Sequence, residues 1–263
     1  MNSPATVPLD GLRNDPYSMI LCYPKLSSEE MERRINELSN LGIVALEFEG
    51  SKEIFGVKVL GKGCVGVVVS AQTSTGRVAL KILRTDADRA GFEHEASMLK
   101  LANSIDVGPR LHDFSSRFLV MEHLSGLPLP EWVKTLAGRG RKNRLKSVLR
   151  GLLEACYKLD HLGLDHGELS RAPKHIIVGE HDSVEIVDFE TASDKRRPSN
   201  VTSLCQYLFL GSELSSRVRR ILGPVRRATL LNALRRYKKD ACPETFQSIL
   251  RASMGREPVK KKL

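Results

Sequence analysis

The sequence predicts an α+β fold whose N-terminal half is rich in strands and whose C-terminal half is mainly helical. In the first half, runs of β-branched and alternating apolar residues are separated by glycines, which is typical of strands joined by tight turns. In the second half, apolar residues recur at helical spacing between positions 143 and 162, which predicts a long helix packed against a core. The rest of the chain is helical in pattern and basic.

The N-terminal region has two parts. Residues 1–26 contain prolines and show little periodicity, so we expect a loose arm there. Ser27 followed by Glu30 fits a capping box, in which each residue satisfies a backbone N–H of the first helical turn. The helix that begins there is expected to end near Asn40.

The strand-rich region follows this helix. A β-rich texture extends over residues 41–70, with strands expected at residues 55–60, 65–70, 77–83 and 118–123. A helix is expected over residues 88–103, with Phe92, Ala96 and Leu99 on one face.

The helical half contains one predicted hairpin. Two short strands are expected at residues 175–178 and 184–187, joined by a turn at residues 179–182. Residues 200–210 are apolar and predict a buried helix.

Composition excludes several classes of protein. The 263 residues are 41% hydrophobic and 27% charged, which are ordinary globular values. There is no run of about 18 apolar residues, so we expect no membrane helix, and the N-terminus lacks the pattern of a signal peptide. The five cysteines are scattered and form no CxxC pair, which favours a reduced, cytoplasmic protein and argues against a cysteine-based zinc site.

The charge balance favours polyanionic partners. The formal net charge is +10 and the isoelectric point is near 9.5. Such a protein tends to contact nucleotides, RNA or acidic protein surfaces.

A glycine-rich segment has the GxGxxG pattern Gly61-Lys62-Gly63-Cys64-Val65-Gly66. A dinucleotide site would require a helix directly after the glycines, but β-branched residues follow at positions 67–69. A Walker-type loop would end in Gly-Lys-Ser or Gly-Lys-Thr, which is missing here. Two interpretations stay open: an ordinary hairpin turn, and a glycine hairpin that covers nucleotide phosphates.

A lysine ends the next apolar strand. Lys81 closes the run Val-Ala-Leu-Lys about 15 residues after the glycines. Burying its ammonium without an anion would be costly, so a partner is expected. Glu95 borders the apolar face of the following helix and is the first candidate, with Glu93 as the second. The alternative is a surface lysine whose stem alone is buried.

The order of these motifs resembles the protein-kinase superfamily. After the glycines, Val-Ala-Leu-Lys and the helix glutamate come Val-Met-Glu-His-Leu at residues 120–124, His-Gly-Glu-Leu at residues 166–169 and Val-Asp-Phe-Glu at residues 187–190. The pattern is most similar to the atypical RIO-type and lipopolysaccharide-kinase-like branches, including RIO-like predicted serine/threonine kinases of archaea. It covers about residues 56–210 and implies a two-lobed kinase-like fold.

The resemblance implies a division of the chain and a cofactor. Residues 1–54 would be the N-terminal arm and helix, residues 55–124 a β-rich small lobe, and residues 125–263 a mainly helical large lobe. ATP would bind with a divalent metal between the lobes. The implied nucleotide-binding residues are Gly61, Lys62, Gly63, Gly66, Val67, Ala79, Lys81, Glu95, Met121, Glu122, Leu124 and His175.

Specific roles follow from the same resemblance. Lys81, fixed by Glu95, would contact the α- and β-phosphates. Met121 would lie behind the adenine, and residues 122–124 would offer backbone groups to it. Asp188 would hold Mg²⁺, a hard cation that prefers oxygen ligands, although a turn-capping carboxylate is the alternative for this residue.

The catalytic loop departs from the family pattern. Glu168 stands where the family has an aspartate, and its extra methylene would move the catalytic carboxylate by roughly 1 Å. The family's metal-binding asparagine is missing, since no asparagine occurs between Asn143 and Asn200. The loop is about two residues longer, and His175 falls where that asparagine is expected. Imidazole suits Mn²⁺ or Zn²⁺ better than Mg²⁺, so His175 is a metal-ligand candidate, with a hydrogen-bonding or phosphate-contacting role as the alternative.

Other residues of this region are expected to hold the loop shape, and the missing motifs indicate reduced peptide recognition. His166 and Gly167 are expected to hold the loop shape, with His166 a structural histidine rather than a base. Phe189-Glu190 replaces the usual Phe-Gly, and no Ala-Pro-Glu follows. A protein substrate would therefore be recognised by another route, and its identity is open.

Two basic regions favour RNA or ribonucleoprotein as a partner. Residues 217–239 contain nine basic side chains and no acidic one, and residues 138–146 form a second patch. A solvated basic face is the alternative, and the scarcity of aromatic residues argues against single-strand stacking. The lysines at residues 260–262 belong to an expected frayed tail.

Three functional hypotheses follow. The first is an ATP-dependent phosphotransferase, a RIO-like serine/threonine kinase or a slow ATPase, with Lys81, Glu168 and Asp188 as catalytic residues. The second is a non-catalytic nucleotide-binding pseudokinase. The third is a ribonucleoprotein-associated factor whose RNA contact depends on bound ATP.

Overall fold

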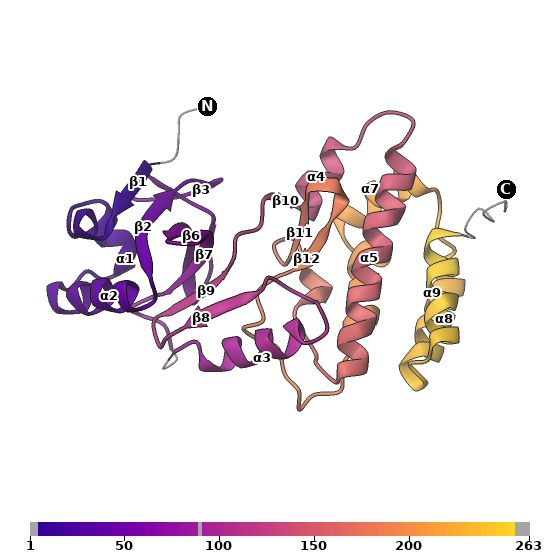
Figure 1. The fold of residues 1–263 in the computed structure, drawn as a ribbon. Coiled ribbons are helices and arrows are strands. Elements are labelled where there is room, and N and C mark those ends of the chain that lie inside the picture. The colour runs from indigo at the N-terminus through magenta and orange to yellow at the C-terminus, as the bar shows by residue number, and fades with distance from the viewer. Residues whose placement is uncertain (1–4, 89–90, 256–263) are drawn as a thin grey trace. The chain divides into compact units, whose positions relative to one another are not determined.

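The computed structural model describes residues 5–88 and 91–255 (Figure 1). The fold is α+β, with a β-rich N-terminal half and a helical C-terminal half, as the sequence predicts. The chain divides into two compact units. Unit 1 contains residues up to 100 together with 109–124, and unit 2 contains residues 101–108 together with those from 125 onward. The predicted tail at residues 259–263 lies outside the described residues.

Unit 1 is built on an antiparallel sheet of seven strands. The strand order is β1-β2-β6-β7-β9-β8, and β5 pairs with β6. Their bounds are β1 Ala5–Pro8, β2 Ile43–Phe48, β5 Gly61–Lys62, β6 Gly66–Thr73, β7 Gly76–Leu83, β8 Leu111–Phe114 and β9 Phe118–Glu122.

The loose arm expected over residues 1–26 is wrong for its described part. β1 pairs with β2 along its whole length, and a 3₁₀ helix η1 (Leu9–Arg13) and helix α1 (Tyr17–Leu21) follow. Their apolar side chains, Leu12, Ile20 and Leu21, are fully buried against the sheet core. These elements are too short to show a periodic pattern of apolar residues in the sequence. The hydrogen bonds between β1 and β2 and the burial of apolar side chains stabilise them.

Helix α2 (Ser28–Asn40) begins and ends where the sequence predicts. The Ser27 hydroxyl accepts from the Glu30 N–H at 3.5 Å, but only this half of the predicted capping box is present among the described residues. The Glu30 carboxylate instead accepts from Arg34 and Arg117, each at 2.8 Å. Arg34 is itself buried and donates to the carbonyl oxygens of Leu21 and Leu83. This network attaches α2 to the sheet.

The strand predicted at residues 55–60 is instead a small hairpin. β3 (Lys52–Ile54) pairs with β4 (Val57–Val59), and Phe55 and Gly56 form the turn with φ values of 52° and 77°. Two positive φ values in a two-residue turn match the right-handed twist of a hairpin, and Gly56 adopts such a value without strain. The apolar Phe55 therefore starts the turn rather than the strand.

The helix predicted over residues 88–103 is shorter than expected. Helix α3 covers Glu93–Asn103, and the predicted face of Phe92, Ala96 and Leu99 is buried. Residues 89–90 lie outside the described part of the chain.

Unit 2 is built around the long helix α5 (Arg141–Leu162). The predicted apolar face is buried from Leu145 to Leu159, and Gly163 ends the helix with a φ of 84°. The predicted hairpin is present as β11 (Ile176–Gly179) and β12 (Val184–Ile186), and β10 (Gly126–Pro128) adds a third strand that the sequence did not indicate. The remaining helices are α4 Leu129–Thr135, α6 Asn200–Cys205, α7 Glu213–Leu222, α8 Arg227–Lys239 and α9 Pro243–Met254.

One helix of unit 2 differs from the prediction. The helix predicted over residues 200–210 is α6 followed by a π-helical turn, η4 (Gln206–Leu210), whose Tyr207, Leu208 and Phe209 are buried. Helices α8 and α9 pack on each other at the end of the described chain (Figure 1). Across the described residues, each helix is too short or too polar to traverse a bilayer.

Candidate functional site

The sheet of unit 1 places four candidate side chains on one face. Residues that pair directly across antiparallel strands point to the same side, as do residues two apart on one strand. Val68 pairs with Lys81, and Ala79 pairs with Met121. The opposite face carries the apolar core, into which the N-terminal helices pack. Lys81, Ala79 and Met121, all predicted from sequence, therefore share the face that the N-terminal segment leaves free.

Val67, predicted as a nucleotide contact, lies on the wrong face. It pairs with Ile82, is 1% exposed and belongs to the core cluster. Val68, which the sequence analysis missed, takes its place beside Lys81. Residues 67–69 are all valine, so the sequence shows no alternation of apolar and polar residues that would assign each side chain to a face of the sheet. The pairing of β6 with β7 makes this assignment.

The glycine segment forms a hairpin and not a strand-to-helix turn, as expected from the β-branched residues that follow it. β5 pairs with β6, and the Gly63 N–H donates to the Gly66 carbonyl at 2.8 Å. A Cβ on Gly66 would lie 3.0 Å from the Ile82 oxygen and 3.1 Å from Lys81 Cγ, whereas one on Gly63 would meet ordinary contacts at 3.6 Å. A side chain at position 66 would therefore crowd the Ile82 carbonyl and the Lys81 stem.

The hairpin is connected to the N-terminal segment. Arg84 donates from its amide to the Val65 carbonyl at 2.9 Å and from its guanidinium to the Gly63 carbonyl at 3.3 Å. The Lys62 ammonium and the Arg84 guanidinium lie 4.7 and 5.1 Å from the centre of the Tyr23 ring. Lys62, predicted to contact nucleotide, thus has a cation–π partner within unit 1.

Lys81 forms the ion pair that the sequence predicts. Its Nζ lies 2.7 and 2.9 Å from the two carboxylate oxygens of Glu95. Lys81 is 6% and Glu95 2% exposed, while Glu93, the second candidate, is exposed. The alternative of a surface lysine is therefore wrong.

The segment predicted to meet the adenine continues from β9. Met121 is partly buried and Glu122 is exposed. The Glu122 N–H donates to the Arg110 carbonyl at 2.8 Å. The His123 Nε2 lies 3.0 Å from the Ser70 hydroxyl of β6, which fixes the segment to the sheet.

In unit 2, His166 occupies the structural role expected of it. It is fully buried, its backbone N–H donates to Asn200 Oδ1 at 2.8 Å, and its ring Nε2 lies 3.1 Å from the Val187 carbonyl oxygen. Its Nδ1 has no hydrogen-bond partner among the described residues. Burial lowers the pKa of His166 to about 4, so the ring is neutral at neutral pH.

Gly167 and Asn200 hold the loop that carries Glu168. Gly167 has a φ of 92°, and a Cβ there would lie 2.8 Å from both Thr191 Oγ1 and Arg196 Nη2. Asn200 is 1% exposed and donates to Asp160 at 2.9 Å and to the Leu164 carbonyl at 2.7 Å. The sequence alone places Asn200 in a buried helix and does not indicate this positioning role.

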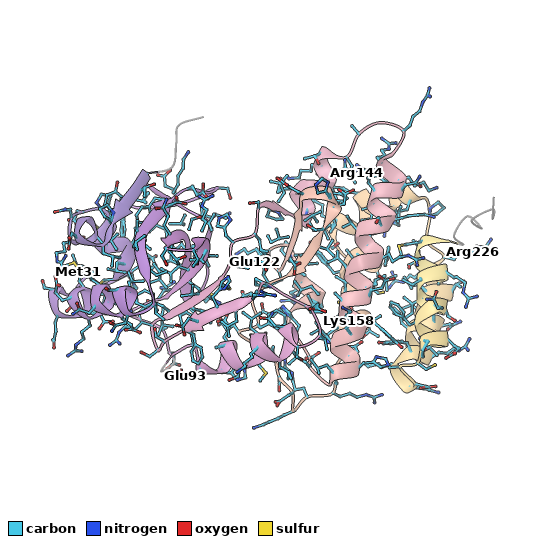
Figure 2. All side chains as sticks on the ribbon, in the orientation of Figure 1. Met31, Glu93, Glu122, Arg144, Lys158 and Arg226 are labelled. Carbon is cyan, nitrogen blue, oxygen red and sulfur yellow. The ribbon has the colours of Figure 1, made fainter. Side chains whose placement is uncertain are left out.

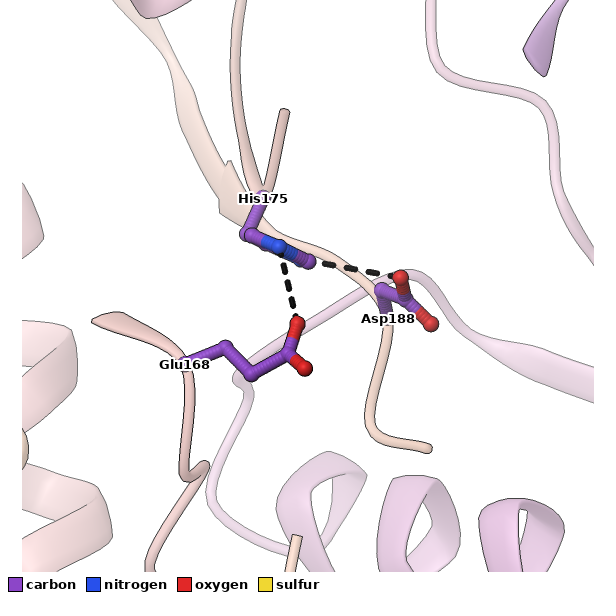
Figure 3. A group of neighbouring side chains, drawn as sticks. All are labelled: Glu168, His175 and Asp188. Atoms are coloured by element: carbon purple, nitrogen blue, oxygen red, sulfur yellow. Dashed lines mark ion pairs between the residues drawn. The ribbon is translucent and has the colours of Figure 1, made fainter. Parts of the chain in front are cut away.

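Three predicted side chains meet in unit 2, as Figure 3 shows. The His175 Nε2 lies 3.0 Å from Glu168 Oε2, and its Nδ1 lies 3.6 Å from Asp188 Oδ2. One potential ligand atom from each residue lies within 4.8 Å of the others, which is compatible with a metal ion. Asp188 has a φ of 72°, a conformation that a non-glycine residue keeps only where the surroundings enforce it.

The donor set of this cluster fits a divalent cation. Two carboxylates suit Mg²⁺ or Mn²⁺, while the imidazole favours the second over the first. Glu168 and Asp188 are the more open members, with side chains 42% and 38% exposed, and His175 is 11% exposed.

The basic side chains of unit 2 lie mainly on its surface. Arg144 near the start of α5 and Arg226 directly before α8 are exposed (Figure 2). In α8 the apolar Leu230 and Leu234 are buried while the arginines and lysines face outward. Some basic residues have partners within the unit: Arg144 pairs with Asp182 at 2.6 Å, and Arg219 donates to the Phe209 carbonyl at 3.0 Å.

Comparison with known proteins assigns no family. No protein-family model matches the chain. The chain is similar to the uncharacterized protein MJ1211 of Methanocaldococcus jannaschii, with 28% identity over 99 residues. The match covers 38% of this chain and 80% of that protein.

Proposed function

We propose that the chain is an ATP-dependent phosphotransferase with a RIO-like, kinase-like fold. A serine/threonine protein kinase is the activity that fits best. The observation that carries this proposal is the buried ion pair of Lys81 and Glu95, adjacent to Gly66 of the glycine hairpin. A buried pair of this kind is a weak source of stability, so a role in holding a phosphate group gives a reason for its presence.

Unit 1 would bind the nucleotide. Val68, Ala79 and Met121 provide apolar contacts on the Lys81 face, and the segment from Glu122 to Leu124 provides backbone groups for the base. Gly61, Gly63 and Gly66 let the hairpin backbone approach the phosphates. Lys81, positioned by Glu95, neutralises phosphate charge.

Unit 2 would bind the metal ion and orient the hydroxyl group that accepts the phosphate. Asp188 holds the divalent cation, which neutralises charge on the phosphates when bound. Glu168 stands where the acceptor hydroxyl would be oriented, and its carboxylate is more than a third exposed. Gly167 and Asn200 fix the backbone of this loop.

The alternative is a protein that binds nucleotide without transferring phosphate, or hydrolyses it slowly as a ribonucleoprotein-associated factor. The specific observation in its favour is the 3.0 Å approach of His175 to the Glu168 carboxylate, which engages the proposed base. The exposed basic side chains of α8, together with Arg220 of α7, favour RNA as the partner of such a factor.

The test is phosphate release from γ-labelled ATP with Mg²⁺ or Mn²⁺, with label on the protein measured in the same samples. We expect turnover that is lost in Asp188→Ala and reduced in Glu168→Ala, while Asp194→Ala, an exposed control, retains it. Labelled protein would favour a kinase over an ATPase. ATP binding without turnover would support the alternative, and absence of ATP binding would remove both.

A further inference from the structure

We infer that His175 and Asp188 together bind a divalent transition-metal ion through His175 Nδ1, with Glu168 orienting the imidazole. The inference deepens the proposed function and rests on it for the role of the ion. The site itself lies entirely within unit 2.

The tautomer of a neutral His175 ring follows from its neighbours. Its Nε2 is 3.0 Å from Glu168 Oε2, a distance at which two lone pairs would repel each other. A neutral imidazole carries its proton on one nitrogen only, so the proton belongs on Nε2. Nδ1 then carries a lone pair and no proton.

The surroundings of Nδ1 indicate a missing cation. Nδ1 is buried and has no hydrogen-bond partner among the described residues. The charged atom it faces is Asp188 Oδ2, at 3.6 Å. The repulsion between this lone pair and the carboxylate oxygen is unfavourable, and a cation between the two atoms would remove that cost.

The geometry allows both atoms to bind one ion. With metal–nitrogen and metal–oxygen bonds of about 2.1 Å, neighbouring ligands lie roughly 3.0–3.4 Å apart. The observed 3.6 Å needs only a small adjustment. A carboxylate on the far nitrogen of a metal-bound histidine, as Glu168 is here, fixes the ring and raises its basicity.

The ligand chemistry selects the ion. Mg²⁺ prefers oxygen ligands and is poorly bound by imidazole, whereas Mn²⁺ accepts both imidazole and carboxylate. We therefore expect Mn²⁺ to bind more tightly than Mg²⁺, and we use Mn²⁺ alone as the probe.

The experiment measures Mn²⁺ binding to the full chain by calorimetry and the nitrogen coupling of bound Mn²⁺ by pulsed electron paramagnetic resonance. We expect a histidine nitrogen signal in the wild type. It should be lost in His175→Asn, which keeps a polar side chain but supplies an oxygen ligand, and the Mn²⁺ preference over Mg²⁺ should fall. His181→Asn is the matched control, because His181 is exposed and its φ of 55° suits asparagine.

Glu168→Gln separates the two roles within the site. It should retain the nitrogen signal and lower the Mn²⁺ affinity by about 10–100-fold, the cost of losing a partner that orients a ligand. An Mn²⁺ ion that binds without nitrogen coupling, or no Mn²⁺ binding, would overturn the inference. ATP binding and phosphate release that persist in that case would leave the proposed function standing. Nitrogen coupling without ATP binding would support the metal site and contradict the proposed function.

Discussion

The ammonium of Lys81 contacts both carboxylate oxygens of Glu95, at 2.7 and 2.9 Å, and both side chains are almost fully buried. Removing one partner of a buried pair leaves an uncompensated charge. We therefore expect Lys81→Met to lower the free energy of unfolding by about 3–5 kcal/mol in addition to abolishing turnover. Urea unfolding followed by circular dichroism measures this.

The double variant Lys81→Met/Glu95→Gln provides the control. Because it also removes the stranded carboxylate, it should recover much of the lost stability but none of the turnover. Equal stability of the single and double variants would contradict a buried pair.

Gly66 and Gly63 form a matched pair for testing the hairpin. Alanine at position 66 would place its methyl 3.0–3.1 Å from the Ile82 oxygen and the Lys81 stem. We expect Gly66→Ala to lower stability by about 1–3 kcal/mol through overpacking and to weaken ATP binding, measured by thermal shift. Gly63→Ala has room and should leave stability unchanged. Similar losses in both variants would speak against the close approach at Gly66.

Asn200 positions the loop before Glu168 through three hydrogen bonds. Asn200→Ala leaves the buried His166 N–H and Leu164 carbonyl without this partner, at a cost of about 1–3 kcal/mol for each group. We expect kcat to fall with little change in ATP affinity. Asn143→Ala, at an exposed position, is the control and should resemble the wild type. A normal kcat in Asn200→Ala would exclude the positioning role.

Glu30 should contribute to acid sensitivity. Burial alone would raise the pKa of Glu30, but hydrogen bonds from Arg117 and Arg34 lower it overall. A carboxyl group whose pKa is lower in the folded state adds stability above its unfolded pKa, and this is lost as the pH falls through the folded value. We expect Glu30→Gln to be less stable than the wild type at neutral pH and to lose less stability on acidification below about pH 4.5. Parallel acid unfolding curves would contradict this linkage.

The N-terminus of α5 carries an unfavourable charge. Its first turn contains basic residues and no acidic one, although the positive end of a helix dipole favours anions. Arg141→Glu should raise the free energy of unfolding by about 0.3–1 kcal/mol. Lys239→Glu, in the last turn of α8, should have the opposite sign. If Arg141→Glu also weakens binding to a single-stranded RNA probe, the charge serves that contact; destabilisation by Arg141→Glu would argue against the dipole explanation.

The sequence predicts best those elements in which a pattern of apolar residues repeats over many positions. Helix α5 was predicted because its apolar spacing repeats over many turns, and the Lys81–Glu95 pair because both residues border apolar patterns. The three consecutive valines at residues 67–69 show no alternation, so the face of Val67 was assigned wrongly. Helix α1 has five residues, too few to show a period, and is stabilised by contacts distant in sequence.

The sequence predicts which residues form the candidate site but not the contacts between them. Glu168, His175 and Asp188 were each selected from the order of motifs. The approach of His175 to the other two depends on the path of residues 169–175, which contains only one short 3₁₀ turn, η2 (Leu169–Arg171). Loop conformations of this kind are determined by hydrogen bonds to other elements, such as the bond from the Val187 N–H to the His175 carbonyl at 2.9 Å. No local pattern encodes them.

Strand β1 and helix α1 also cover part of the sheet of unit 1. β1 pairs with an edge of β2 and ends in Pro8, which cannot donate a ladder hydrogen bond. A chain shortened to begin at residue 27 would present the bare edge of β2 beside the uncovered apolar face around Val69 and Leu80. An open edge next to an apolar surface is a template for aggregation. Residues 5–26 therefore cover a surface that would otherwise favour self-association.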